Sequence, residues 1–140
     1  MLFECAAESY IPLLDTFRRL VEDGFSPQVT LGLTPVLTEQ LGDKDFKSGF
    51  IAYVEGRIEA AREDERTFAD GGEAHLAYLA KRWQEHYGKL LDTFKNVYNQ
   101  DLVGAFRKLQ DEGHIEIITS AATHAYFPLL ASDISIQAQL

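Results

Sequence analysis

The sequence predicts a mostly helical α/β protein with two short parallel strands. Two β-type runs, Gln28–Leu33 and His114–Thr119, are separated by residues 34–113, whose pattern is mostly helical. Parallel strands need such a long crossover, whereas antiparallel neighbours can be joined by a short turn. Because two strands of this length form no stable sheet alone, we expect the remaining strands to lie elsewhere, on another copy or on a further piece of chain.

The composition is that of one acidic globular domain, which we expect to extend over residues 1–140. The hydrophobic share of 46% and the charged share of 25% are ordinary for a folded chain. The formal net charge of −9 disfavours nucleic acid and anionic membrane surfaces as partners. We find neither an apolar run long enough to cross a membrane nor a basic signal-peptide start, and therefore expect a cytoplasmic protein.

Residues 3–22 carry apolar side chains at helical spacing, and Gly24 is placed to end that helix. Pro12 interrupts the pattern because it has no N–H to donate and its ring crowds the preceding turn. The proline is tolerated most easily if Ser9 caps a new helix. The sequence therefore predicts a break or kink near Ser9.

The strand predicted at Gln28–Leu33 leads directly into a short helix. Thr34 is a typical N-cap residue, and Pro35 follows at the first helical position, where its missing N–H has no intrahelical partner to lose. Gly42 ends this helix. The segment therefore predicts strand, turn and helix in direct succession.

Two long helices are predicted next. The first runs from Asp43 or Asp45 to the break at Asp70-Gly71-Gly72, and the second continues without interruption to Val97. Their apolar residues recur at helical spacing, so we expect the pair to pack as a hairpin. The residues expected to face inward are Phe46, Phe50, Tyr53, Val54, Ile58, Ala61, Leu76, Leu79, Ala80, Trp83, Tyr87, Leu90, Leu91, Phe94 and Val97.

The last predicted helix begins after Asn99 or Asp101 and ends at Gly113. Its inward residues are Leu102, Val103, Phe106 and Leu109. The β-branched run His114–Thr119 is too short for a helix and is predicted as the second strand. The tail from Leu129 to Leu140 has no clear period.

His114 and Glu116 are the first candidate site residues. They are two apart on a strand and therefore share one face, with Ile115 and Ile117 on the other. Polar residues on a face of a covered parallel sheet favour a polar cavity. The alternative is that His114 is half exposed at the start of the strand and that Glu116 is paired with a basic group.

His124 is the third candidate, a few residues beyond the end of the second strand. Loops at the carboxyl ends of parallel strands hold substrate groups in α/β folds, and the small residues before His124 would let a ligand approach. The alternative is a surface histidine in a loop.

The chain shows no metal-binding or cofactor-binding motif. Its histidines lack the spacing of a zinc site, and its one cysteine, Cys5, allows neither an internal disulfide nor a cysteine-based zinc site. No Gly-rich phosphate loop follows a strand. We therefore predict no metal and no cofactor.

Three segments, in this order and at these separations, resemble the N-terminal part of glycoside hydrolase family 57, most closely its 1,4-α-glucan branching enzyme group. They are Phe3–Leu14 (FECAAESYIPLL), Val29–Leu37 (VTLGLTPVL) and Gly113–His124 (GHIEIITSAATH). The third segment is the most specific, since a Gly-His-Ile-Glu strand followed by a Thr-His loop is a signature region of the family.

The resemblance implies a distorted seven-stranded (β/α) barrel that acts on α-1,4-glucans with retention of configuration, through a glutamate nucleophile and an aspartate acid/base. Residues 29–33 then correspond to the second barrel strand and residues 115–119 to the third, with the long helices as an insertion that covers one side. His124 lies where the family's signature histidine lines the sugar site. Glu116 and His114 lie where the motif points into the barrel.

The resemblance does not extend to the catalytic residues. The family's first strand would precede Phe3, and the strands with its nucleophile and acid/base would follow Leu140, so we name no catalytic residue in this chain. The retaining mechanism needs two carboxyl groups about 5–5.5 Å apart, and Glu116 lies on a different strand from either.

These observations lead to a first hypothesis and an alternative. The first is a truncated family 57 protein of α-glucan metabolism, such as that of glycogen or starch, which is inactive alone and binds α-1,4-glucan weakly or not at all. Exposed strand edges then predict self-association or a complementing chain as partner. The alternative is a non-catalytic acidic helical interaction module derived from that family.

Overall fold

A computed structural model describes all residues, Met1 to Leu140. The chain forms two compact units. The first comprises Met1–Pro12 and Lys44–Gln100, and the second comprises Leu13–Asp43 and Asp101–Leu140. The single domain expected over residues 1–140 stays a prediction, and both compact units are made of two separate stretches of the chain.

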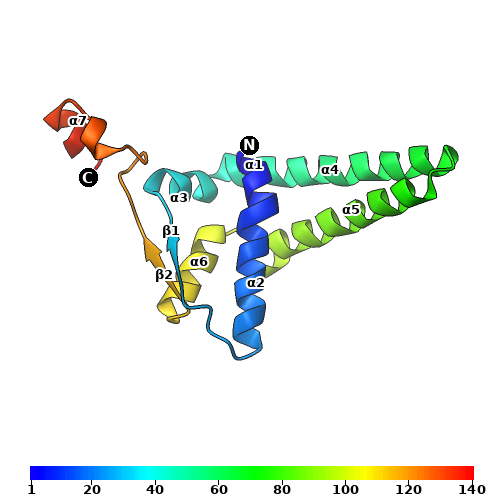
Figure 1. The fold of residues 1–140 in the computed structure, drawn as a ribbon, viewed down its shortest axis with the longest axis horizontal. Coiled ribbons are helices and arrows are strands. Elements are labelled where there is room, and N and C mark those ends of the chain that lie inside the picture. The colour runs from blue at the N-terminus through cyan, green and yellow to red at the C-terminus, as the bar shows by residue number, and fades with distance from the viewer. The chain divides into compact units, whose positions relative to one another are not determined.

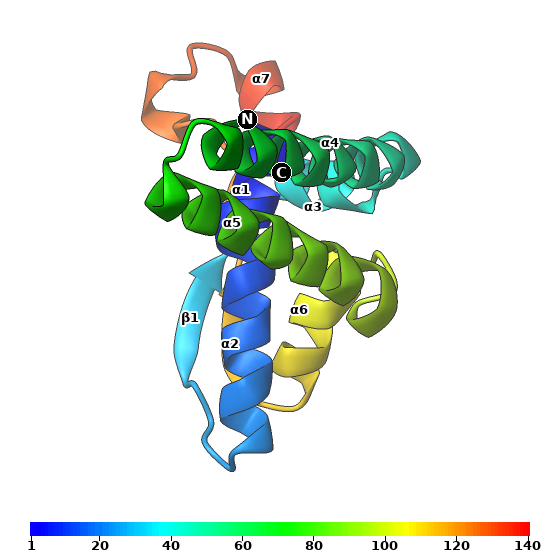
Figure 2. The same ribbon diagram turned by 90° about the vertical axis from the view of Figure 1, so that its right-hand side faces the viewer.

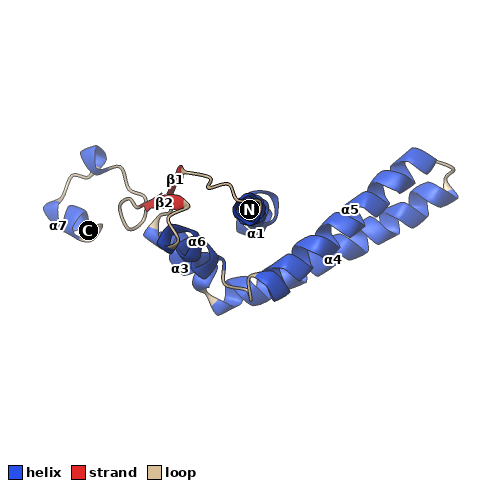
Figure 3. Ribbon diagram, turned by 90° about the horizontal axis from the view of Figure 1, so that it is seen from below, coloured by secondary structure: helices blue, strands red, loops and turns tan.

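The second unit contains a two-stranded sheet (Figures 1 and 3). Strands β1 (Val29–Gly32) and β2 (Ile115–Ile118) are hydrogen-bonded neighbours and run parallel, with Val29 opposite Ile115 and Gly32 opposite Ile118. The predicted pair of parallel strands is confirmed. Each strand lacks the first and the last residue of the run predicted from the sequence, since the predicted runs were 28–33 and 114–119.

Two helices of the second unit pack near this sheet. Helix α3 (Pro35–Gly42) contacts helix α6 (Leu102–Asp111), and α6 contacts β2. Ile115 is buried, whereas Glu116 is exposed. The Ile117 N–H points away from β1 and donates a hydrogen bond of 2.8 Å to the side-chain oxygen of Gln110 on α6. One face of the sheet is therefore covered and the other is open.

Both predicted helix caps of this unit are confirmed. Thr34 caps α3 by accepting a hydrogen bond from the Leu37 N–H, and Pro35 stands at the first helical position. Asp101 caps α6 and accepts a hydrogen bond of 2.8 Å from the Gly104 N–H. Each cap satisfies an N–H that would otherwise have no partner in the first helical turn.

The first unit is dominated by the predicted helical hairpin. Helices α4 (Lys44–Asp70) and α5 (Ala74–Asp92) lie side by side in every view (Figures 1, 2 and 3). The turn between them contains Gly72, whose φ of 76° is in the left-handed region that favours glycine. The aromatic rings of Phe50 and Phe94 pack edge to face, with their centroids 4.7 Å apart, and both residues are fully buried.

The inward face predicted for the second helix of the hairpin is wrong in part. Ala80, Leu90 and Phe94 are buried as expected. The residues that are exposed instead are Leu76, Leu79, Trp83 and Val97. Trp83 is the most exposed of them, with 54% of its surface exposed. A hairpin of two helices is only one layer thick, so the apolar stripe of Leu76, Leu79 and Trp83 has no second layer to pack against. Val97 lies away from the tip, in the π-helical turn after α5.

The predicted continuous period of this helix is also interrupted. Residues Thr93–Val97 form a π-helical turn, and Asn99 and Gln100 then adopt positive φ angles of 50° and 60°. A π-helical turn inserts one residue into the helical repeat. The chain therefore stays helical to Val97, as predicted, but its regular α-helical period ends at Asp92.

A second π-helical turn lies near the N-terminus. Helix α1 (Leu2–Cys5) continues through the π-helical residues Ala6–Tyr10 into helix α2 (Ile11–Glu22). The wider turn comes directly before Pro12, whose ring would clash with the carbonyl group of a regular preceding turn. The interruption predicted near Ser9 is thus present, as a π-helical turn rather than as the start of a new helix.

The C-terminal residues contain a 3-10 turn at Phe127–Leu129 and the short helix α7 (Asp133–Gln137). Gln139 ties this segment to the loop after β2, because its side-chain oxygen accepts hydrogen bonds of 2.9 Å from the N–H and the hydroxyl of Thr123. None of the helices has the length and apolar character needed to cross a membrane.

Candidate functional site

The open face of the sheet carries a hydrogen-bonded pair at its centre. Glu116 on β2 lies directly opposite Thr30 on β1, and the Thr30 hydroxyl donates a hydrogen bond of 2.7 Å to the Glu116 carboxylate. The expected alternation is present, with Glu116 exposed and Ile115 buried. The carboxylate has a hydroxyl partner, not the basic partner considered from the sequence.

His114 lies just before the amino end of β2. Its Nδ1 is 3.1 Å from the Ser26 hydroxyl oxygen, and its Nε2 is 4.0 Å from a carboxylate oxygen of Glu112. The imidazole is half buried, with 24% of the side chain exposed. His114 is thus a partly buried residue just before β2, held by a hydroxyl group and close to one carboxylate.

His124 follows the other end of β2, in a tight turn. Its φ of 62° is in the left-handed region, and its N–H donates a hydrogen bond of 2.7 Å to the Ala121 carbonyl oxygen. The imidazole is exposed, and its Nδ1 lies 3.1 Å from the Ser120 hydroxyl oxygen. A histidine held in this uncommon backbone region marks a site at which the local structure dictates the conformation.

The three candidate residues are therefore spread along one strand. His124 and His114 follow and precede β2, at its opposite ends, and Glu116 lies between them on the open face. Each has a hydroxyl partner that the sequence did not predict: Thr30 for Glu116, Ser26 for His114 and Ser120 for His124. The strand register would have identified Thr30, because it stands directly opposite Glu116.

The structure brings no three potential metal ligands together. Cys5 is a free, half-buried thiol. His75 and His86 are exposed on α5.

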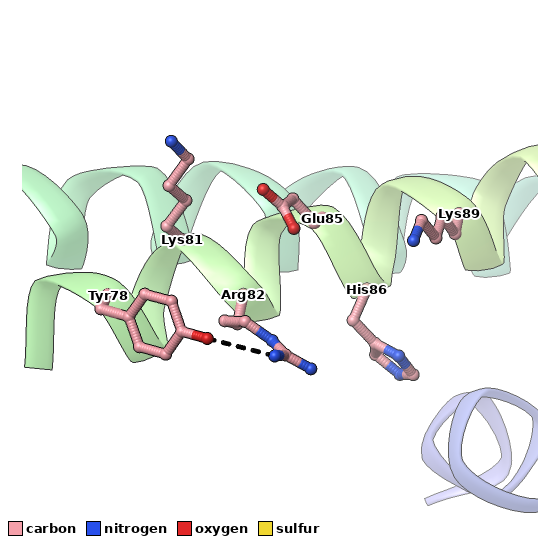
Figure 4. A pocket seen from close by; sticks show the side chains of 6 residues that line it. All are labelled: Tyr78, Lys81, Arg82, Glu85, His86 and Lys89. Atoms are coloured by element: carbon pink, nitrogen blue, oxygen red, sulfur yellow. Dashed lines mark hydrogen bonds between the residues drawn. The ribbon is translucent and has the colours of Figure 1, made fainter. Parts of the chain in front are cut away.

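One cavity lies along α5, at a distance in sequence from these candidates. It has a volume of about 610 Å³, and Figure 4 shows the side chains that line it. Its lining residues are Tyr78, Lys81, Arg82, Glu85, His86 and Lys89. Arg82 donates a hydrogen bond of 3.2 Å to the Tyr78 hydroxyl, and this contact raises the pKa of the guanidinium above its ordinary value. With Glu85 as its one carboxylate, this groove cannot form a carboxylate pair.

A smaller cavity of about 250 Å³ lies on the covered side of the sheet, between α3, α6 and the strand ends. Arg107 is its one charged lining residue. The other lining residues are the apolar Leu33, Pro35, Val103 and Ile117 and the polar Thr38, Gln110 and Thr119. Neither cavity holds the two facing carboxyl groups that glycoside hydrolysis requires.

Comparison with known proteins accounts for this arrangement. The profile of glycosyl hydrolase family 57 matches residues 1–140, the whole chain, which therefore belongs to that family. The chain is 40% identical over 139 residues to the 1,4-alpha-glucan branching enzyme TK1436 of Thermococcus kodakarensis. That alignment covers 99% of this chain and 20% of the relative.

Solved structures place the chain more narrowly, as a homologue of the branching enzymes of this family. The GH57-type branching enzyme of Pyrococcus horikoshii superposes with a TM-score of 0.91 at 40% identity, over 99% of this chain and 25% of that one. TK1436, solved in complex with glucose and additives, gives a TM-score of 0.84 at 41% identity, over 99% of this chain and 24% of TK1436. The alpha-amylase AmyC of Thermotoga maritima gives 0.81 at 33% identity over 91% and 24%.

The chain thus spans between a fifth and a quarter of the length of these relatives. Its two parallel strands, the helices beside them and the helical hairpin match part of the family 57 fold, so the predicted partial barrel is confirmed. The family resemblance stated from the three sequence segments is confirmed as well.

Proposed function

We propose that these 140 residues form part of the wall of a barrel that binds an α-1,4-glucan. The observation that carries the proposal is the two-sided sheet. One face of β1 and β2 is covered, while the open face presents Glu116, and His124 follows the carboxyl end of β2. In barrels of parallel strands, substrate groups come from strand ends and from the loops that follow them.

The three candidate residues have different places in this proposal. His124 lies in the loop at the carboxyl end of β2 and contacts the sugar. Glu116 lines the same face, and its carboxylate can accept hydrogen bonds from sugar hydroxyls in addition to that from Thr30. His114 lies at the opposite end of the strand. Whether it also contacts the glucan is tested with a variant of its own.

We further propose that the 140-residue polypeptide neither hydrolyses nor branches glucan by itself. Retaining chemistry needs two carboxyl groups about 5–5.5 Å apart, one as nucleophile and one as acid/base. Glu116 is the one carboxylate on the two strands, and the residues beside it are apolar, hydroxyl-bearing or glycine. Binding by these residues is expected to be weak, because the open face presents one carboxylate, Glu116, and the loop after β2 presents one imidazole, His124.

Calorimetric titration with maltohexaose tests the binding proposal. The chain is expected to bind, and His124→Ala and Glu116→Gln are expected to weaken binding by about fivefold each, the factor for one lost hydrogen bond. His114→Ala measures the residue at the far end of the strand. His75→Ala removes an exposed histidine of α5 and is the matched control. Absence of binding by the unaltered chain would refute the proposal.

A second measurement tests the absence of turnover. The purified chain is incubated with amylose, and both reducing ends and α-1,6 branches are determined over time. We expect neither to rise above the level of a no-protein sample. Turnover that co-purifies with the chain through successive columns would contradict the proposal.

The exposed residues of the hairpin favour a second candidate function, an acidic module that docks onto another chain. Tyr78 and Trp83 keep 53% and 54% of their surfaces exposed on α5, and exposed aromatic residues are enriched in protein interfaces. The partner would be a second copy or a complementing chain. Association that Trp83→Ala abolishes and His124→Ala leaves intact, in a chain that fails to bind maltohexaose, would favour this module over the glucan-binding wall.

A further inference from the structure

The turn that carries His124 contains a short chain of hydrogen-bonding groups. The Ser120 hydroxyl donates to the Ala121 carbonyl oxygen across 3.3 Å, and His124 Nδ1 lies 3.1 Å from the same hydroxyl oxygen. The Ala121 carbonyl also accepts the His124 N–H at 2.7 Å. Three groups of one turn therefore meet at Ser120 and Ala121.

The single hydroxyl hydrogen of Ser120 limits how this chain can be arranged. If that hydrogen pointed at His124 Nδ1, the Ser120 oxygen would face the Ala121 carbonyl oxygen with no hydrogen between them, and one contact would become repulsive. If it points at Ala121, the Ser120 oxygen is free to accept from a protonated Nδ1, and both contacts are hydrogen bonds. Hydrogen bonds aligned in this way also strengthen one another.

We infer that Ser120 is a positioning residue that holds His124 in the Nδ1–H tautomer. The other ring nitrogen, Nε2, then carries no hydrogen and can only accept a hydrogen bond while the imidazole is neutral. The imidazole is exposed, so Nε2 is available to a ligand. This inference rests on the proposed function for its ligand: His124 accepts a hydrogen bond from a hydroxyl group of an α-glucan.

The backbone supports this assignment. The left-handed conformation of His124, with its φ of 62°, turns the residue back toward Ser120, four positions earlier in the chain. Left-handed backbone is costly for a residue with a Cβ atom, and such residues persist where neighbouring contacts fix them. The contact with Ser120 thus defines both the ring orientation and the tautomer.

Nitrogen-15 NMR of the imidazole rings tests the inference without any ligand. The chain has four histidines, and His124→Gln identifies the signals of His124. Spectra are recorded over a series of increasing pH, up to the range in which the ring signals no longer change. We expect His124 Nε2 to resonate as a bare ring nitrogen and Nδ1 as a protonated one.

Three variants show whether Ser120 causes this state. Ser120→Ala is expected to shift His124 toward the Nε2–H tautomer that free histidine prefers in water, and Ser120→Thr is expected to leave it unchanged. Ser26→Ala is the matched control, because it removes a contact of the same 3.1 Å length from His114 and should leave His124 unaffected. An Nε2–H tautomer in the unaltered chain, or no shift in Ser120→Ala, would overturn the inference.

A maltohexaose titration separates this inference from the proposed function. Ser120→Ala is expected to bind about fivefold more weakly and Ser120→Thr as well as the unaltered chain, as for one neutral hydrogen bond. If the unaltered chain does not bind maltohexaose, the proposed function fails, and the NMR tautomer alone decides about Ser120. If it binds and Ser120→Ala binds equally well, the positioning role is refuted.

Discussion

Thr30 and Glu116 face each other across the two parallel strands, and the Thr30 hydroxyl donates a hydrogen bond of 2.7 Å to the Glu116 carboxylate. These residues are far apart in sequence, and the bond adds a side-chain contact to the backbone hydrogen bonds that set the register of the two strands. It also ties the one carboxylate of the open face to a defined position.

Replacing Thr30 with Val removes this bond while keeping the β-branched shape. Because the pair is exposed, we expect the free energy of unfolding to fall by only about 0.5–1 kcal/mol. Urea denaturation of Thr30→Val, Glu116→Gln and the double variant measures the coupling. If the two single effects simply add, the residues do not interact in solution.

Gly49 and Gly56 on α4 provide a matched pair of substitutions. A Cβ at Gly49 would come within 2.7 Å of the Phe3 ring, whereas a Cβ at Gly56 would meet nothing within 4 Å. Gly56→Ala is therefore expected to stabilise the helix by about 1 kcal/mol. Gly49→Ala gains the same propensity but crowds the ring, so we expect a net loss of about 1 kcal/mol.

Urea denaturation of the two variants decides this prediction. The Phe3 ring already contacts Phe46 and Tyr53, each with ring centroids 5.7 Å apart, so it has few ways to move aside. Equal stabilisation by both substitutions would mean that Phe3 does not pack against α4.

The left-handed turn at His124 predicts an unusual order of stability among variants. Glycine has no Cβ and adopts this conformation freely, whereas alanine keeps the strain of about 1–2 kcal/mol. Since glycine loses part of this advantage through its larger freedom in the unfolded chain, we expect His124→Gly to be more stable than His124→Ala by about 1 kcal/mol.

The neighbouring residue Ala122 serves as control for that comparison. Its φ is not positive, so Ala122→Gly is expected to lower the free energy of unfolding by about 0.5–1 kcal/mol. A His124→Gly variant that is less stable than His124→Ala would show that the turn is not left-handed in solution.

The cap of α6 depends on Asp101, whose carboxylate accepts the Gly104 N–H at 2.8 Å. Asp101→Ala leaves this N–H without a partner and is expected to cost about 1 kcal/mol. Asp101→Asn retains a side-chain acceptor and is expected to lie within a few tenths of a kcal/mol of the unaltered chain. Both values come from urea denaturation, and an equal loss in the two variants would point to charge rather than capping.

The exposed Ile118 side chain on the open face of the sheet predicts concentration-dependent association. Ile118 lies two residues from Glu116 and keeps 52% of its surface exposed, and removal of this apolar surface from water favours a contact between molecules. Sedimentation velocity is expected to show a weight-average mass that rises with concentration. Ile118→Thr is expected to reduce it, while a chain that stays monomeric at every concentration would contradict the prediction.

Sequence reasoning identified the elements because local chemistry defines them. Each of the two helix caps involves residues close together in the sequence, Thr34 and Pro35 in one and Asp101 and Gly104 in the other. The turn at Gly72 likewise needs a left-handed backbone. The parallel order of the strands followed from the length of the crossover. Each of these signals is contained in a short stretch of chain or in a connection length.

The sequence did not predict the burial of α5 or the hydroxyl partners of the candidate site. Apolar periodicity reports which residues share a face, but only the neighbouring layer decides whether that face is covered, and Trp83 has no such layer. A π-helical turn adds one residue without changing the kind of side chains present. Thr30 and Ser26 become partners only through the register between β1 and β2.

Gln110 gives the outer side of β2 a property of its own. Its side-chain oxygen takes the Ile117 N–H at 2.8 Å, so this backbone donor is not available as a template for another polypeptide. Unprotected strand borders nucleate fibrous aggregates. The Gln110 side chain therefore protects this N–H of β2 from pairing with a strand of another molecule. Any strand that pairs there must first displace the glutamine.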